Sequence, residues 1–323
     1  MIFSPKDILP IAEATGFNAG AVEKVCFLLK LLNMLNAHPF IKHKFVLKGG
    51  TALNLFFFEM PRLSVDIDLN YIGEVDRAKM LEERPLLEKA LQAIFSREDF
   101  SIKRMPDEHA GGKWRLGYQS YTGQPGNLEV DLNFMFRQPL LPVKQLDSCT
   151  LGNFQAKAIP VVDIHELAAG KLAALFSRHQ ARDLFDAHKL FTEERLDLPT
   201  LRTVFIVYGA FNRKDWRTLS LENISFDKKE LEEMLYPLLR RNFISEDAGL
   251  ISFAQKLTDE SRNKISAIFP FTECEIEFLN AVLDRGEIKP ELITTDVAFQ
   301  KRISKHPMLQ WKAVNVRKHF KIG

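Results

Sequence analysis

A glycine turn early in the sequence has the residue types of a phosphate-binding loop. It reads Lys48-Gly49-Gly50-Thr51 and follows the apolar run 45–47. Gly49 and Gly50 can adopt positive φ and bring backbone N–H groups close to an anion. Thr51 is expected to cap a short helix, whose N-terminus favours phosphate. The turn therefore predicts a polyanion site, and Lys48 either reaches the phosphate or simply ends the strand.

Three aspartates supply the ligands of a divalent-metal site. Asp66 and Asp68 are two residues apart on an expected strand, so both side chains leave the same face. Asp131 lies on a later strand with the same alternation, and Glu129 is the alternative third ligand. Carboxylate oxygens suit Mg²⁺ or Mn²⁺, and such close like charges repel unless cations neutralise them. The alternative is an ordinary acidic sheet face, but the nearby glycine turn favours the metal site.

A second charged set lies on two expected helices, 164–176 and 181–191. Two of its basic residues share one helix face, and its two aspartates are one turn apart. A lysine and aspartates placed in this way suit phosphoryl chemistry, in which positioning and charge stabilisation dominate. The alternative is structural: the same side chains hold the two helices together as ion pairs. The set consists of Lys171, Arg178, Arg182, Asp183 and Asp186.

Other polar residues have weaker patterns. Arg62 and Ser64 directly precede the aspartate strand. Arg62 has the planar geometry to bind a nucleotide phosphate, or it makes a surface salt bridge. For three histidines on different helix faces we expect surface or capping roles rather than a metal site. They are His165, His179 and His188.

The elements that must position these residues predict an α+β fold. It consists of a small mixed β-sheet with flanking helices, followed by an all-helical C-terminal domain; the expected domains are 1–160 and 161–323. Residues 1–43 are expected to be helical, and helix 75–97 is expected to break or restart at Pro85. A turn is expected at Gly111-Gly112 and another at 123–127. The expected strands are 45–47, 65–69, 100–105, 114–121, 128–134 and 154–159, and later helices are expected at 198–212, 228–241, 247–257 and 275–283.

Composition narrows the class of protein. The 323 residues are 46% hydrophobic and 27% charged, and no apolar run is long enough to span a membrane. The N-terminus has no signal-peptide pattern. Three widely spaced cysteines, Cys26, Cys149 and Cys274, fit a reducing cytoplasm and argue against a disulfide framework or a zinc site.

The charge distribution is uneven, although the net charge is only +2. No acidic residue follows Asp296, and the last 27 residues contain seven basic ones. This tail is either a solvated helical segment or a contact for a nucleic-acid backbone. The basic residues are Lys301, Arg302, Lys305, Lys312, Arg317, Lys318 and Lys321.

The motifs together resemble the nucleotidyltransferase toxins of the AbiEii/AbiGii family, within the DNA polymerase β-like nucleotidyltransferase superfamily. The resemblance covers roughly residues 45–190, because the charged set on the two helices is similar to the family's later motifs. Two departures concern Thr51, where many members have Ser, and its distance from Asp66, which is long for the superfamily. The matching segments are Lys48-Gly49-Gly50-Thr51-Ala52-Leu53 and Arg62-x-Ser64-x-Asp66-Ile67-Asp68-Leu69.

The resemblance implies a nucleotidyltransferase core and a helical domain that closes a cleft over an NTP. It implies a cytoplasmic toxin of a type IV toxin–antitoxin or abortive-infection system, with a cognate antitoxin encoded nearby. The reaction would transfer NMP to an RNA, with tRNA as one candidate, and release pyrophosphate. The implied catalytic residues are Asp66, Asp68, Asp131, Lys171, Asp183 and Asp186, of which the first three would hold metal. The implied nucleotide-binding residues are Lys48, Gly49, Gly50, Thr51, Arg62, Ser64, Arg178 and Arg182.

Two other functions remain open at this point. The first is a nucleotidyltransferase that modifies a protein or a small molecule. The second is a catalytically idle protein that binds nucleotide and a partner. The intact carboxylate set argues against the second, because three converging acids are costly without a metal.

Overall fold

The computed structural model describes residues 2–244 and 249–321 and separates into two compact units. The first comprises Met1–Val162 and Pro237–Phe243, and the second comprises Asp163–Tyr236 and Ile244–Gly323. A short segment of the second half of the chain therefore belongs to the first unit. The division of the chain into domains 1–160 and 161–323 stays a prediction.

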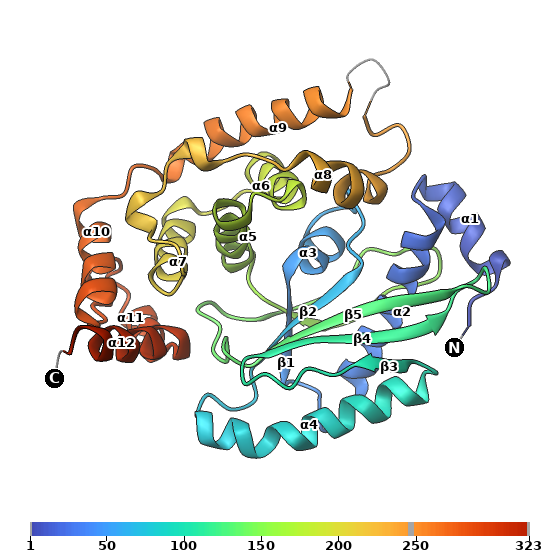
Figure 1. Cartoon of the computed structure of the whole chain (residues 1–323), viewed down its shortest axis with the longest axis horizontal. Helices are drawn as coiled ribbons and strands as arrows, with labels where there is room; N and C mark the ends of the chain where they lie inside the picture. Colours follow the sequence, from blue (N-terminus) through green and yellow to red (C-terminus); the bar gives the residue numbers. More distant parts are fainter. Residues whose placement is uncertain (1, 245–248, 322–323) are drawn as a thin grey trace. The chain divides into compact units, whose positions relative to one another are not determined.

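Within the described residues, seven strands form one mixed sheet in the first unit (Figure 1). Their order is β3-β4-β5-β2-β1-β7-β6; the pairs β2–β5 and β1–β7 are parallel, and the others are antiparallel. The predicted mixed sheet with flanking helices is confirmed. The elements are α1 (Pro5–Thr15), α2 (Ala19–Ala37), β1 (Phe45–Lys48), α3 (Gly49–Ala52), β2 (Asp66–Tyr71), α4 (Arg77–Arg97), β3 (Ser101–Arg104), β4 (Gly111–Gln119), β5 (Pro125–Asn133), β6 (Lys144–Leu146) and β7 (Ile159–Val161).

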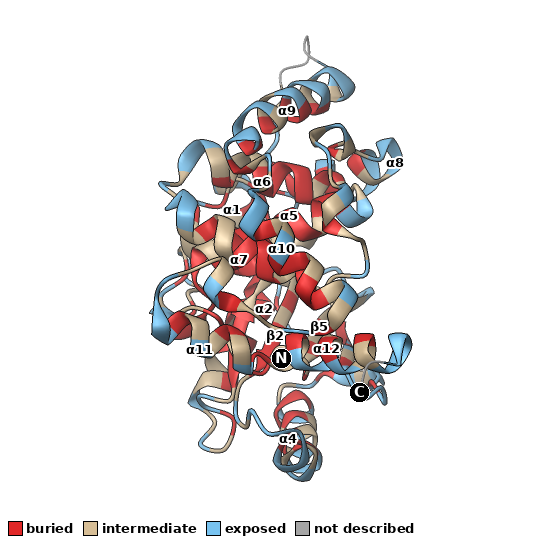
Figure 2. Ribbon diagram, turned by 90° about the vertical axis from the view of Figure 1, so that its left-hand side faces the viewer, coloured by how far each residue is buried: buried red, intermediate tan, exposed pale blue. Residues whose placement is uncertain are grey.

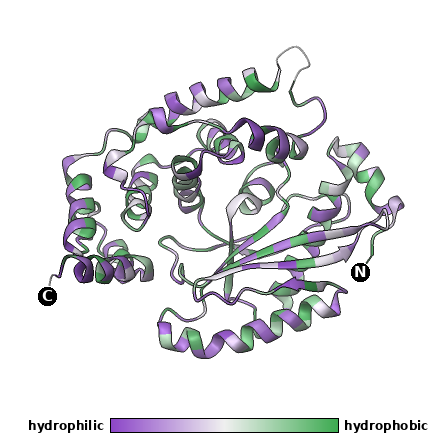
Figure 3. Ribbon diagram, in the orientation of Figure 1, coloured by the Kyte–Doolittle hydropathy of each residue, from purple (hydrophilic) through white to green (hydrophobic). Residues whose placement is uncertain are grey.

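Alternation along the strands gives the sheet one apolar and one polar face. In β5, Leu128, Val130 and Leu132 are buried, whereas Glu129 and Asp131 are half-buried. The same alternation of hydrophobic and hydrophilic residues is visible along the central strands in Figure 3. Because strand side chains alternate with a period of two, the candidate metal ligands lie on the face opposite the core.

Helices α2 and α4 cover the apolar face. The ring of Phe27 in α2 lies 4.4 Å from that of Tyr118, and the ring of Phe95 in α4 lies 5.5 Å from that of Trp114. Trp114 and Tyr118 are both in β4 and point to the same side. The odd-numbered residues of β4 therefore lie on the opposite, polar face.

Several predicted boundaries were wrong. Helix α4 runs through Pro85 without a break, and Pro85 lies on its exposed side, where water can satisfy a carbonyl that has lost its partner. Gly111 and Gly112 begin β4 instead of forming a turn; a Cβ on Gly111 would lie 2.0 Å from the carbonyl oxygen of Leu132 on β5. The last strand, β7, begins where the predicted strand 154–159 was to end, and β6 was not predicted.

Among the described residues of the second unit, every regular element is a helix, which confirms the predicted helical C-terminal region. The inner faces of α5, α6 and α7 are buried (Figure 2), and Phe205 contacts both Phe176 and Trp216. In place of the predicted helix 228–241, the short helix α8 is followed by one π-helical turn and one 3₁₀ turn. Of the predicted helix 247–257, residues 247 and 248 lie outside the described residues. The helices are α5 (Ile164–Arg178), α6 (Ala181–Glu193), α7 (Leu198–Ala210), α8 (Lys228–Glu230), α9 (Leu250–Ile265), α10 (Glu273–Asn280), α11 (Val297–Lys305) and α12 (Pro307–Phe320).

In residues 2–244 and 249–321, no helix combines the length and the apolar character that crossing a membrane requires.

Candidate active site

The glycine turn brings the backbone into direct contact with an aspartate. Gly49 has φ of 74°, a conformation that favours glycine. A Cβ at this position would lie 2.0 Å from Oδ2 of Asp68. Lys48, the last residue of β1, precedes the turn in an extended conformation. Glycine is therefore required at position 49 for Asp68 to lie against the turn.

Thr51 holds the turn to the next strand. It is fully buried, and its hydroxyl donates a hydrogen bond to the carbonyl oxygen of Asp66. Helix α3 already begins at Gly49, so the prediction that Thr51 caps the helix was wrong. With its hydroxyl committed to the backbone, Thr51 positions the turn, and the predicted contact of this hydroxyl with phosphate does not fit the geometry.

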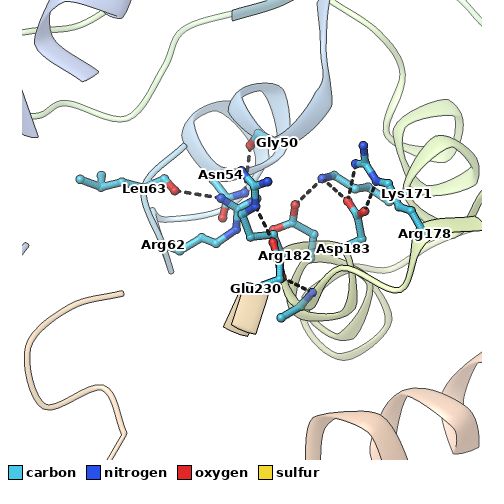
Figure 4. Close-up of polar contacts among 11 residues, drawn as sticks. Gly50, Asn54, Arg62, Leu63, Lys171, Arg178, Arg182, Asp183 and Glu230 are labelled. Atoms are coloured by element: carbon cyan, nitrogen blue, oxygen red, sulfur yellow. Dashed lines mark hydrogen bonds and ion pairs between the residues drawn. The ribbon is translucent and has the colours of Figure 1, made fainter. Parts of the chain in front are cut away.

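A buried amide outside the predicted set also supports the turn. Asn54 Nδ2 donates a hydrogen bond of 2.9 Å to the carbonyl oxygen of Gly50 (Figure 4). Asn54 is fully buried in the apolar run 53–58. A single amide within such a run was the available signal, because a buried polar group needs a partner.

Four charged residues form a row across four neighbouring strands. Lys48 of β1 pairs with Asp68 of β2, Asp68 pairs with Asp131 of β5, and Asp131 pairs with Lys113 of β4. Neighbouring strands are about 4.8 Å apart, and directly paired residues share a face. The row thus places two adjacent carboxylates between two lysines. Lys113 was missed because β4 begins earlier than predicted.

The carboxylates of the row influence each other. Burial raises the pKa of Asp131, the negative charge of Asp68 raises it further, and Lys48 and Lys113 oppose both effects. Asp66 lies in the next register position, opposite Glu129. The polar face therefore carries four carboxylates on the two adjacent strands β2 and β5.

Glu129 has partners of its own. Its carboxylate accepts hydrogen bonds from Lys113 Nζ at 2.8 Å and from Arg115 Nη2 at 3.1 Å. The bond from Lys113 is the main cause of the lowered pKa of Glu129. As the alternative third metal ligand, Glu129 would have to give up these contacts.

The donor set suits a metal that arrives with a nucleotide. Among the described residues, no three His, Cys, Asp or Glu side chains are already gathered as a metal site. Asp68 and Asp131 are nevertheless adjacent in register, and Asp66 shares their face. Mg²⁺ in nucleotide sites is bound by one or two carboxylates, with water and substrate phosphates completing its shell. The residues fit that arrangement.

The charged set of the second unit forms a buried cluster (Figure 4). Lys171 Nζ lies 2.7 Å from Asp186 Oδ2 and 3.1 Å from Asp183 Oδ1. Arg178 donates to both oxygens of Asp183, at 2.7 and 3.1 Å. Asp183 and Asp186 are fully buried, whereas the Arg178 side chain is 55% exposed. Helices α5 and α6 are thus joined by ion pairs, and catalytic roles for these residues stay predictions.

Arg182 differs from the predicted structural network. Its Nε lies 2.8 Å from Oε1 of Glu230 in α8, so its observed partner is not the aspartate pair. Burial would raise the pKa of Asp183, but Lys171 and Arg178 outweigh it and lower that pKa. Lys171 and Arg178 therefore favour the ionised form of the Asp183 carboxylate.

The residues before the aspartate strand are buried. Arg62 is 2% exposed and donates a hydrogen bond of 2.8 Å to the carbonyl oxygen of Leu63, which excludes a surface salt bridge (Figure 4). Ser64 is also buried. The three histidines make separate contacts: His165 with Asp163, His179 with Ser225 and His188 with Glu260.

The basic C-terminal residues are partly engaged in packing. Arg302 lies over the ring of Phe299, Lys312 donates to the carbonyl oxygen of Asn212, and Arg317 donates to that of Gly286. The other four are exposed on α11, α12 and the residue after α12. They are Lys301, Lys305, Lys318 and Lys321.

Comparisons with known proteins agree with this fold. Residues 30–269 match a family described as nucleotidyl transferase AbiEii toxin, type IV toxin–antitoxin system, and this span contains the turn, the row and the cluster. No curated protein matches the chain. Among solved structures, MenT4, a nucleotidyltransferase toxin from Mycobacterium tuberculosis H37Rv, is similar with a TM-score of 0.64 and 16% sequence identity. The similarity covers 95% of this chain and 99% of MenT4, and it shows the fold.

Proposed function

The chain belongs to the AbiEii family of nucleotidyltransferase toxins of type IV toxin–antitoxin systems, and on that premise we propose that it transfers NMP from an NTP to an RNA acceptor. The observation that carries the proposal is the row of Lys48, Asp68, Asp131 and Lys113 beside the glycine turn. The row combines adjacent hard oxygen ligands with flanking cations, as transfer of a triphosphate-derived group needs.

The residues of the row and the turn have separate tasks in this proposal. Asp68 and Asp131, with Asp66 beside them, hold Mg²⁺ or Mn²⁺ together with the nucleotide phosphates. The bound metal would neutralise charge on the triphosphate. The backbone N–H groups of Gly49 and Gly50 hold phosphate oxygens.

The chemical step is an in-line displacement at the α-phosphorus. An acceptor hydroxyl oxygen forms a new P–O bond, the bond to the β-phosphate oxygen breaks, and pyrophosphate leaves. Asp131 either accepts the hydroxyl proton or completes the metal site. Lys113 balances the charge of Asp131 from the neighbouring strand. In the helical unit, Lys171 is proposed to neutralise charge on the triphosphate and Asp183 or Asp186 to orient it or the acceptor; a cleft between the two units stays a prediction.

The biological setting follows from the family. A type IV toxin implies an antitoxin, which we expect to be encoded next to this gene. The cytoplasm is the compartment that holds both NTPs and RNA.

Label transfer tests the proposal. The purified protein is incubated with Mg²⁺ or Mn²⁺, each labelled NTP in turn, and total RNA, and the RNA is separated from protein. Asp68→Asn and Asp131→Asn should each lower transfer by at least about 100-fold, since each removes charge stabilisation at the reacting group. Asp107→Asn is the matched control, because Asp107 is exposed and lies outside the row.

Each contrary outcome has a defined meaning. Label on protein instead of RNA would favour a protein acceptor. Nucleotide binding without pyrophosphate release would favour an idle binding protein. Full activity of the two row variants would refute the metal assignment.

A further inference from the structure

A β-bulge at the edge of the sheet gathers basic side chains on the polar face. Ile102 of β3 pairs with Leu116 of β4, but Arg104 pairs with Arg115, so Lys103 is an extra residue. A bulge of this kind turns two successive side chains toward the same side. Arg104 shares the face of Arg115, its partner in register.

Lys103 lies on that face as well. A Cβ built on Gly117 would lie 2.7 Å from Cε of Lys103, so the lysine side chain crosses the strand at this glycine. Gly117 has the same side-chain direction as Arg115 and Lys113, two and four residues earlier. We name these four residues the β3–β4 basic strip: Lys103, Arg104, Lys113 and Arg115, all of them exposed.

The strip is strongly positive and close to the row. Glu129 neutralises part of the charge of Lys113 and Arg115, and Lys113 also pairs with Asp131, so most of the positive charge of the strip lies on the outer pair, Lys103 and Arg104. The strip begins at Lys113, one strand spacing of about 4.8 Å from Asp131, and extends outward to Arg104, which is two spacings from β5 and two residues along it, or about 12 Å from Asp131. A polyanion on the strip would therefore extend directly to the carboxylates.

We propose that the acceptor RNA lies with its phosphate backbone across the β3–β4 basic strip and presents its reacting hydroxyl to Asp131. This inference rests on the proposed transfer to RNA and names the surface that binds the acceptor. Lysine and arginine supply the sequence-independent part of nucleic-acid binding through phosphate contacts. The seven basic C-terminal residues offer fewer cations for phosphate contacts, because three of them are engaged in packing.

Binding of RNA without NTP tests the strip separately from catalysis. The probes are bulk tRNA and a fluorescein-labelled single-stranded RNA, titrated between about 50 and 200 mM salt. The variant Lys103→Gln plus Arg104→Gln removes the outer pair, which touches neither Glu129 nor the row. Its matched control is Lys89→Gln plus Arg97→Gln, an exposed pair on α4, which covers the opposite face of the sheet.

Loss of two phosphate contacts should lower the salt slope by about 1.4 and weaken binding roughly tenfold near 0.15 M salt. The control variant should bind RNA as the wild type does, and both should keep the wild-type affinity for NTP with Mg²⁺. The charge-retaining variant Lys103→Arg plus Arg104→Lys should restore binding, which separates charge from packing over Gly117.

Three results would overturn the strip as the RNA surface: unchanged RNA binding by the outer-pair variant, equal weakening in the α4 control, or binding of an acidic protein in place of RNA. Failure of the proposed function looks different. In that case RNA binding depends on the strip, but no label is transferred to RNA.

Discussion

Replacing Lys171 by Met should destabilise the helical unit by several kcal/mol. The lysine side chain is only 11% exposed and contacts two carboxylates that are fully buried. Methionine keeps the apolar stem but removes the charge, so Asp183 and Asp186 lose their shared cation. Removing one partner of a buried ion pair costs about 3–5 kcal/mol, because the remaining charge stays away from water.

The expected change in melting temperature follows from that free energy. For a domain of this size, 1 kcal/mol corresponds to about 2–4 °C, so Lys171→Met should melt about 6–20 °C lower. Scanning calorimetry at pH 7 measures the shift. Lys256→Met is the matched control: Lys256 is 74% exposed, lies 3.9 Å from Glu260, and should change stability by less than about 1 kcal/mol.

The pH dependence supplies a second measurement on the same pair of proteins. In the wild type the native pKa of Asp183 is lowered, so its stabilising contribution is complete above the unfolded value of about 3.9. That contribution is lost as the pH falls through the native pKa. Without Lys171 the native pKa of Asp183 rises, so acid unfolding of the variant should begin at a higher pH.

A melting temperature within about 2 °C of the wild type, together with an unchanged acid transition, would refute the reasoning. The buried cluster would then contribute no net stability. The rate of nucleotidyl transfer per folded molecule, measured well below both melting temperatures, tests the predicted catalytic role of Lys171 separately.

Two further predictions concern the first unit. Gly49→Ala should lower transfer at least about 100-fold and lower stability by about 1–2 kcal/mol or more, because its Cβ would meet Asp68 at a positive φ. Gly123→Ala is the control, since Gly123 has a similar φ with open space around it. Equal activity of the two variants would contradict the prediction. Glu23→Gln should stabilise the protein at pH 8 but not at pH 4. The gain at pH 8 should be about 1.4 kcal/mol for each unit by which the pKa of Glu23 is higher in the native than in the unfolded state. Burial raises the pKa of Glu23, so its ionised form lowers stability above the unfolded pKa of about 4.3, whereas glutamine is neutral and still accepts the hydrogen bond from the Tyr121 N–H. Urea unfolding at both pH values measures the stability of each protein. An equal stability difference at the two pH values would contradict the prediction.

The sequence was most informative where side-chain alternation and turn chemistry are local. The period-two pattern around Asp66 and Asp68 predicted which face they share, and Gly49 has the positive φ that the glycine turn allows, although the group against its backbone is the side chain of Asp68. Both depend on a few neighbouring residues. The pairing of Asp68 with Asp131 was harder, since register between distant strands depends on the whole sheet.

Errors arose where a residue type has two opposite uses. Gly111 allows two strands to approach closely instead of forming a turn, and Pro85 lies on the exposed surface of a helix. Thr51 illustrates the same ambiguity at the candidate site, because a hydroxyl can bind a ligand or the chain's own backbone. Composition cannot distinguish these uses; the packing of neighbouring segments does.

The row on the sheet and the buried cluster on α5 and α6 differ in their charge balance, although the sequence motifs predicted catalytic residues in both. In the buried cluster each carboxylate already has a cation within 3.1 Å: Lys171 contacts both Asp183 and Asp186, and Arg178 contacts Asp183.

Within β4, β5, β2 and β1, the polar-face positions in register with Asp66 and Asp68 hold more acids than bases, and Arg104 on the outer strand β3 adds a fourth base. The acids are Asp66, Asp68, Asp131 and Glu129, and the bases are Lys48, Lys113 and Arg115. Two of these cations are hydrogen-bonded to Glu129, and the adjacent charge of Asp68 raises the pKa of Asp131. An external cation is therefore favoured by the sheet face and not by the cluster. Replacing Asp68 or Asp131 should consequently weaken metal binding in the presence of substrate. Replacing Lys171 should first lower the stability of the protein.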